Sequence, residues 1–178
     1  MKEEKAIELL RKYSPDKKSF ESVLTHSRAV QNLALEWAGK IKESGYRVDI
    51  NFVKTASLLH DIGAFKYPPW SKDRIKHGIA GAEILRKEGF PKHARICEVH
   101  IGAGLTKEDI EKGNLPLPPK NYVPITIEEK IITCADNLIE GGKRKTIEWA
   151  VRRFEREVGK DYAKKVYNLY KKLTDMMK

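Results

Sequence analysis

Ionisable side chains occur in this chain at positions whose neighbours along the helical repeat are apolar. His26 lies in a stripe with Val30 and Trp37, and His60-Asp61 follows an apolar run at residues 56–59. Burying an unpaired imidazole or carboxylate costs several kcal/mol. The residues in question are His26, His60, Asp61, His100 and Asp136. Because several occur together, we interpret them as partners of one another, most simply around a metal ion.

Each of these residues has a plain structural alternative when it is taken alone. A single histidine on an apolar face is more often a core residue bonded to a backbone carbonyl, and Asp61 or Asp136 could form an ordinary ion pair. His77 could simply open a helix. For His26, His60, Asp61 and Asp136 together, four independent coincidences are a poor explanation. His93 stands beside Lys92 and Arg95, so we predict that it lies at the surface.

The residue types indicate which metals such a site would take. Neutral imidazoles with carboxylates and no thiolate suit Mn, Fe, Co, Ni or Zn, and they disfavour a structural zinc site. With His77 included, four histidines and two aspartates exceed the needs of one ion, so one or two ions are expected. Asp61 could bridge a pair, which would generate hydroxide near neutral pH and clamp phosphoryl oxygens.

The elements that must position these side chains are helices. Apolar residues recur at three- and four-residue steps, and Gly, Pro and capping residues separate the segments. We expect an all-α fold without a convincing strand. Expected helices cover about 3–13, 23–45, 49–63, 77–89, 91–100, 106–113, 126–140, 147–158 and 162–173. Prolines at 68–69 and 116–124 indicate irregular segments.

Length and composition favour one ordinary globular domain. The 178 residues are 40% hydrophobic and 34% charged, which argues against disorder. No apolar run is long enough for a membrane span, and no secretory signal is evident. Cys97 and Cys134 have no paired spacing, so we expect neither a disulfide nor a thiolate zinc site. A reducing, cytoplasmic location is therefore expected.

The net charge of +10 favours an anionic partner. Nucleic acid, nucleotides and phosphorylated metabolites are all attracted by such an excess, although it also serves solubility. No membrane association is expected. The amphipathic helices after residue 146 could serve an oligomer interface as easily as a core, so the oligomeric state is left open.

The order of the motifs resembles a known family. The chain has His26, then Leu58-Leu59-His60-Asp61-Ile62-Gly63, then Ala135-Asp136. This order resembles the HD-domain metal-dependent phosphohydrolase superfamily. Within that superfamily it is most similar to the His-Asp-Ile-Gly branch and to small archaeal-type proteins. The resemblance spans Thr25 to Gly142. It implies a phosphodiesterase-like helical bundle, with a single domain over 1–178, a metal-site core at about 20–142 and a C-terminal helical extension at about 146–178.

The resemblance also implies roles for individual residues. It implies that His26, His60, Asp61 and Asp136 bind the first metal, and His77 and His100 stand where the histidines for a second metal occur. We expect Asp61 and His60 to be catalytic. Many relatives have Lys directly after His-Asp-Ile-Gly, whereas this chain has Ala64, with Lys66 two residues on.

Contacts to a substrate phosphate are indicated less strongly. Candidates by their place in the sequence are Lys66, Arg28, Lys143 and Arg144, and the last two could equally be a solvated charge run. The segment 67–70, Tyr-Pro-Pro-Trp, could be a lid or an aromatic face for a base, or could pack against the body. The Gly-Tyr-Pro block that cyclic-di-nucleotide enzymes have is absent after His100.

The sequence therefore predicts a metal-dependent phosphohydrolase that acts on a nucleotide or another small phosphoester. Two alternatives remain open at this point. One is a dinucleoside polyphosphate or cyclic-nucleotide hydrolase, and the other is a non-catalytic, nucleic-acid-binding helical module.

Overall fold

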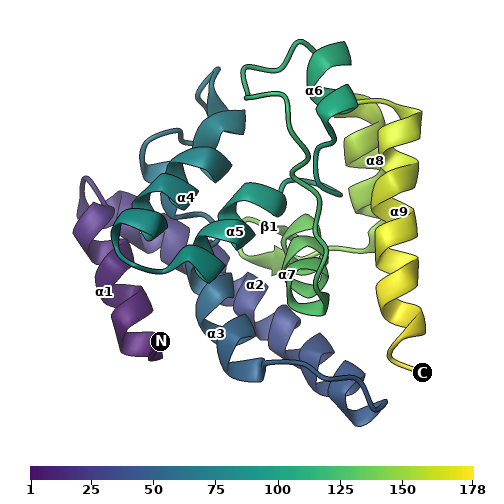
Figure 1. Ribbon diagram of the computed structural model, residues 1–178, viewed down its shortest axis with the longest axis horizontal. Coiled ribbons are helices and arrows are strands. Elements are labelled where there is room, and N and C mark those ends of the chain that lie inside the picture. The colour runs from purple at the N-terminus through teal and green to yellow at the C-terminus, as the bar shows by residue number, and fades with distance from the viewer.

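Helices make up nearly all the regular structure, as the sequence predicts. A computed structural model describes residues 1–178 (Figure 1). The helices are α1 (Glu3–Tyr13), α2 (Lys17–Glu43), α3 (Ile50–Leu59), α4 (His77–Lys87), α5 (Pro91–Val99), α6 (Lys107–Lys112), α7 (Ile127–Asn137), α8 (Ile147–Glu157) and α9 (Lys160–Asp175), with short 3-10 helices η1 (Ile62–Phe65) and η2 (Arg74–Lys76). None of these helices is both long and apolar enough to cross a membrane.

Capping residues account for where several helices begin. The Asp49 side chain accepts a hydrogen bond from the Phe52 N–H at the start of α3. Thr126 and Glu129 form a reciprocal capping box at the start of α7, which confirms the predicted start of that helix. Each such bond satisfies an N–H that has no partner inside the helix. Local capping bonds thus fix where α3 and α7 begin, and these two helices carry candidate site residues.

The longest helix, α2, packs against both α3 and α7. Their side chains contribute to the largest hydrophobic core, to which Val30 and Trp37 of α2 and Ile131 of α7 all belong. Leu173 of α9 joins the same core. In Figure 1, α9 runs beside α8 on the side of the molecule opposite α1. The two C-terminal helices therefore pack on the helices that carry the candidate site.

Two glycines allow backbones to approach closely around the site. A Cβ on Gly63 would overlap the carbonyl oxygen of His77 and lie 2.5 Å from the Gly81 nitrogen, so η1 packs directly on α4. A Cβ on Gly78 would lie 2.6 Å from the Cys97 carbonyl oxygen, so α4 also packs closely on α5. These contacts bring the end of α3, the start of α4 and the end of α5 together.

A small hairpin and an isolated antiparallel bridge between Leu105 and Tyr122 depart from the expected all-helical content. β1 (Ile139–Glu140) pairs with β2 (Lys143–Arg144) in antiparallel register. The turn is Gly141-Gly142, with φ of 55° and 74°. Positive φ at both central residues is what a type I′ turn requires, and glycine adopts it without a steric penalty. From the sequence, these glycines indicate only the end of the helix expected at about 126–140.

Candidate metal centre

The six side chains singled out by sequence come from five helices and meet at one place. His26 and Asp136 lie within α2 and α7, whereas the other four stand at helix ends. His60 is the C-cap of α3 and Asp61 follows it. His77 opens α4, and His100 is the C-cap of α5. These four side chains therefore extend from the ends of their helices toward a common point.

One half of the cluster surrounds the carboxylate of Asp136. Its Oδ1 lies 2.9 Å from the Nε2 of His26 and 3.4 Å from the Nε2 of His60. The Oδ2 of Asp61 lies 3.7 Å from the His26 nitrogen and 3.8 Å from the His60 nitrogen. These two histidines and two aspartates thus face a common point.

The other half of the cluster uses the second oxygen of Asp61. Its Oδ1 lies 3.2 Å from the Nε2 of His77 and 3.4 Å from the Nε2 of His100. The two imidazole nitrogens are 2.9 Å apart. Asp61 therefore presents one oxygen to each half, which is the arrangement a carboxylate needs to bridge two ions.

Backbone carbonyls assign the tautomer of three of these imidazoles. The Nδ1 atoms of His60, His77 and His100 lie 2.7, 2.5 and 2.8 Å from the carbonyl oxygens of Ser57, Arg74 and Cys97. A carbonyl only accepts hydrogen bonds, so each Nδ1 donates its hydrogen. In the neutral ring, Nε2 then carries a lone pair, and all three lone pairs point into the cluster.

Internal hydrogen bonds leave part of the cluster unsatisfied, and its imidazole and carboxylate donors fit a divalent cation. The Nε2 of His60 is fully buried without a hydrogen-bond partner. The lone pairs of His77 and His100 face each other, which is unfavourable unless a proton or a cation lies beside them. Imidazoles whose other nitrogen is bonded to a carbonyl are typical metal ligands. Two triads have ligand atoms close enough to share an ion: His26, His60 and Asp136, and His60, Asp61 and His100.

The electrostatics of the metal-free protein follow from this crowding. Burial lowers the pKa of His26 and of His60, but the carboxylates of Asp136 and Asp61 outweigh burial, so both pKa values are raised. Burial raises the pKa of Asp61, but the surrounding imidazoles, His60 foremost, reverse this and hold it below its usual range. Burial lowers the pKa of His77. Burial also raises the pKa of Asp136, but its hydrogen bonds with His26 and His60 reverse this and lower it. Both carboxylates therefore stay ionised and available as ligands.

Two cavities open onto the cluster, and both are lined by His26, Asp61, Ala64 and Pro69. The larger, of about 820 Å³, also includes Phe65, Trp70 and the Gly141-Gly142 turn. Trp70 is 84% exposed, so the segment 67–70 does not bury its indole against the body. The smaller cavity, of about 450 Å³, includes His77, His100, Asp136, Arg74 and Arg153.

The four candidate phosphate contacts lie outside these two cavities. Arg28 binds Glu3 and Gln31, and Arg144 pairs with Glu36 at 3.0 Å. Lys66 lies over the Tyr67 ring and lines a separate small cavity. Lys143 is exposed on β2. Arg74 and Arg153, which do line the smaller cavity, were missed because nothing in the sequence distinguishes them from the other arginines.

The prediction that His93 lies at the surface is wrong. His93 is 7% exposed, and its ring packs edge-on against Phe52 and Phe90. The Nε2 of His93 and the Oγ1 of Thr55 are 2.9 Å apart and form a hydrogen bond. The helix α5 packs on α3, and this covers His93, whereas its sequence neighbour Lys92 is exposed and Arg95 is partly buried.

Comparison with known proteins assigns the family. The HD-domain family model matches residues 23–141, more than half of the chain, and the chain belongs to that family. An uncharacterized protein of Methanocaldococcus jannaschii is 44% identical over the full length of both chains. The family match confirms the resemblance seen in the order of His26, His60-Asp61 and Asp136.

Other similar proteins are longer or more distant. A tRNA (cytidine(56)-2′-O)-methyltransferase of Thermoplasma volcanium is 37% identical over 98% of this chain, and this chain spans only 47% of that protein. The HD domain of the L. monocytogenes phosphodiesterase PgpH is similar in structure, with a TM-score of 0.57, 20% identity and coverage of 97% and 94% of the two chains. The same domain in complex with cyclic-di-AMP gives a TM-score of 0.54 at 21% identity. These two structures support the fold.

Proposed function

We propose that this protein is a metal-dependent phosphohydrolase that acts on a nucleotide or another small phosphoester. The observation that carries the proposal is the convergence of three imidazole lone pairs on two ionised carboxylates, with the Nε2 of His60 buried and unpartnered. Membership of the HD-domain family supports it.

The roles of the individual side chains follow from their positions. His26, His60, Asp61 and Asp136 would hold one divalent ion, and Asp61, His77 and His100 a second. A bound pair of Mn, Fe, Co, Ni or Zn ions supplies hydroxide near neutral pH and charge neutralisation at phosphoryl oxygens. The carbonyls of Ser57, Arg74 and Cys97 hold the imidazoles in one orientation. Asp61, supported by His60, is the residue we expect the reaction to depend on most.

The cavities support a substrate of nucleotide size. Both are within the range of small-molecule sites, and the exposed indole of Trp70 offers an aromatic surface for a base. A dinucleoside polyphosphate or cyclic-nucleotide substrate remains the alternative within the same chemistry. The PgpH HD domain binds cyclic-di-AMP, which supports a nucleotide in general for a related fold.

A metal-defined substrate screen tests the proposal. The protein is stripped with a chelator, reloaded with each candidate metal and assayed against a panel of nucleotides and small phosphoesters. We expect Asp61→Ala to reduce hydrolysis by at least about a hundredfold, because ligand loss exceeds the 10–100-fold effect of changes in the residues behind ligands. Circular dichroism should show unchanged helicity. Absence of hydrolysis by wild-type protein of verified metal content would contradict the proposal.

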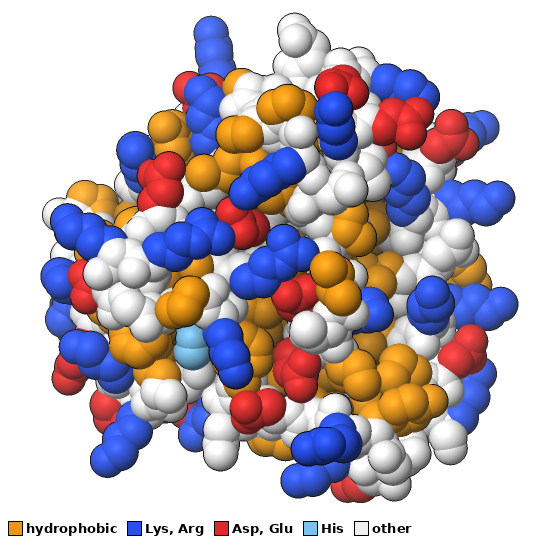
Figure 2. Space-filling model, viewed as in Figure 1, with side chains coloured by type: hydrophobic (Ala, Val, Ile, Leu, Met, Phe, Trp, Pro, Cys, Tyr) orange, Lys and Arg blue, Asp and Glu red, His pale blue; other side chains and the backbone are white.

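A second candidate function is nucleic-acid binding, and two observations favour it. Two relatives, from T. volcanium and Picrophilus torridus, are named tRNA methyltransferases, and this chain matches just under half of each. A groove of about 590 Å³ between α7 and α9 is lined by Lys130, Lys165, Lys171 and Lys172. Figure 2 shows lysine and arginine side chains scattered over one face of the molecule, with acidic and hydrophobic side chains among them.

The salt dependence of RNA binding tests this second candidate. Three of the groove lysines have no carboxylate within 4 Å, whereas Lys165 pairs with Asp109 at 2.7 Å. Neutralising phosphates releases counterions, so affinity for a tRNA should fall steeply with salt. Replacing Lys171 and Lys172 by Ala should flatten that dependence. Equal salt slopes for wild type and variant would remove the groove from consideration.

A further inference from the structure

Arg153 differs from the other arginines that are partly buried. Only three arginines, Arg28, Arg95 and Arg153, have intermediate exposure. Arg28 binds Glu3, and Arg95 binds both Glu129 at 3.3 Å and a backbone carbonyl. Arg153 has no carboxylate within 4 Å, and its Nε is buried without a hydrogen-bond partner. The buried Nε is a donor that the protein leaves unsatisfied, so this arginine is available for an anion from outside the protein.

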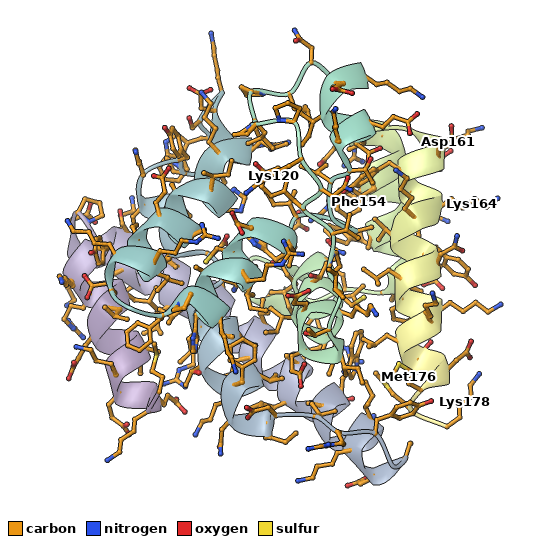
Figure 3. All side chains as sticks on the ribbon, in the orientation of Figure 1. Lys120, Phe154, Asp161, Lys164, Met176 and Lys178 are labelled. Carbon is orange, nitrogen blue, oxygen red and sulfur yellow. The ribbon has the colours of Figure 1, made fainter.

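Aromatic rings hold the Arg153 side chain in position. Its guanidinium carbon lies 4.5 Å from the centre of the Phe154 ring and 5.2 Å from that of Trp149. Phe154 is 7% exposed and lies on the side of α8 that faces the body of the molecule, where it is labelled in Figure 3. Stacking on aromatic faces limits the conformations of the guanidinium, so less entropy is lost when it binds an anion.

The surroundings of Arg153 also leave it free. Glu157, one helical turn further along α8, lies 3.9 Å from Arg74 and not within pairing distance of Arg153. Arg153 and Phe154 line the same 450 Å³ cavity as His26, Asp61, His77, His100 and Asp136. The unpaired cation and the candidate metal ligands therefore share one small space.

We infer that Arg153 binds a phosphate oxygen of the substrate while the scissile phosphorus lies at the candidate metal centre. The inference rests on the proposed phosphohydrolase function, for which it supplies the phosphate-binding side chain. The planar guanidinium can donate two parallel hydrogen bonds to a phosphate, which a lysine ammonium cannot reproduce. The ligand class is a phosphoester whose non-bridging oxygens carry negative charge.

Binding of inorganic phosphate to metal-loaded protein tests the inference separately from turnover. Calorimetric titration is carried out on wild type, Arg153→Ala, Arg153→Lys and the control Arg152→Ala. Arg152 is the neighbouring residue on α8, is exposed, has no ion pair and lies outside the cavity. We expect Arg153→Ala to weaken phosphate binding at least tenfold, Arg153→Lys to restore part of the affinity, and Arg152→Ala to match wild type.

Hydrolysis of a phosphoester found in the substrate screen provides the second measurement. Arg153→Ala should raise KM at least tenfold with its metal content and helicity unchanged. Undetectable phosphate binding by wild type, or equal binding by wild type and Arg153→Ala, would overturn the inference. If phosphate binds through Arg153 but no ester is hydrolysed, the proposed function fails and the anion site stands.

Discussion

The histidines of the candidate metal centre and His93, the one histidine outside it, have opposite relations to their surroundings. At the candidate centre, His60 is fully buried and its Nε2 has no hydrogen-bond partner within the protein. His93, also buried, has a hydroxyl partner in Thr55 and two aromatic neighbours. The contrast shows that burial alone does not identify a functional histidine. The informative feature is a ring nitrogen that the protein itself leaves unsatisfied, in the company of other such atoms.

The largest expected difference between His60 and His93 is in how much a bound metal stabilises the folded protein. A ligand that binds only the folded state stabilises it by about 2.7 kcal/mol at a concentration 100 times its dissociation constant. We expect a gain of about that size in urea unfolding for wild type and for His93→Gln, and less than half of it for His60→Gln. Circular dichroism of each metal-free variant checks folding. An equal gain in His60→Gln would show that the ion binds elsewhere.

Lowering the pH should destabilise the folded protein through protonation of His93. Burial lowers the pKa of His93 to about 4, against 6.5 for an unperturbed imidazole. Between these values the unfolded chain binds a proton that the folded chain does not, so stability rises with pH there. The contribution is fully present above pH 6.5 and is lost as the pH falls toward 4.

The acid effect is measured as a difference between two metal-free proteins. Wild type should lose about 2 kcal/mol more than His93→Gln between pH 7 and pH 5, as the shift of the pKa implies. The raised pKa values of His26 and His60 have the opposite sign, stabilising the protein at low pH, and they cancel in this difference. Parallel pH profiles for the two proteins would refute the interpretation.

The smallest expected effect is at Thr55. Thr55→Val keeps the shape of the side chain and removes the hydroxyl that bonds to the Nε2 of His93. Leaving that nitrogen without a partner should cost about 1 kcal/mol of unfolding free energy. Metal content should not change, since Thr55 is not among the residues of the cluster. A loss of metal would mean that metal binding at the cluster depends on the hydrogen bond between Thr55 and His93.

Much of the fold could be predicted because the relevant signals are local. Helical periodicity, Pro15, and caps such as Asp49 and Thr126 specify helices from short stretches of chain. The hairpin at Gly141-Gly142 was not expected because strands of two residues each leave no periodic signal. The proposed division into a core at about 20–142 and a C-terminal extension remains a prediction, although both parts share one hydrophobic core.

The sequence by itself determined the chemical types of the candidate ligands and their apolar setting. His26, His60, Asp61 and Asp136 stand out because a polar residue in an apolar repeat is visible from neighbouring residues alone. Which further residues belong to the site followed from the packing of the helices alone. The burial of His93 and the position of Arg153 beside the cluster depend on helices that are distant along the chain, since periodicity describes the faces of one helix and not what packs against them.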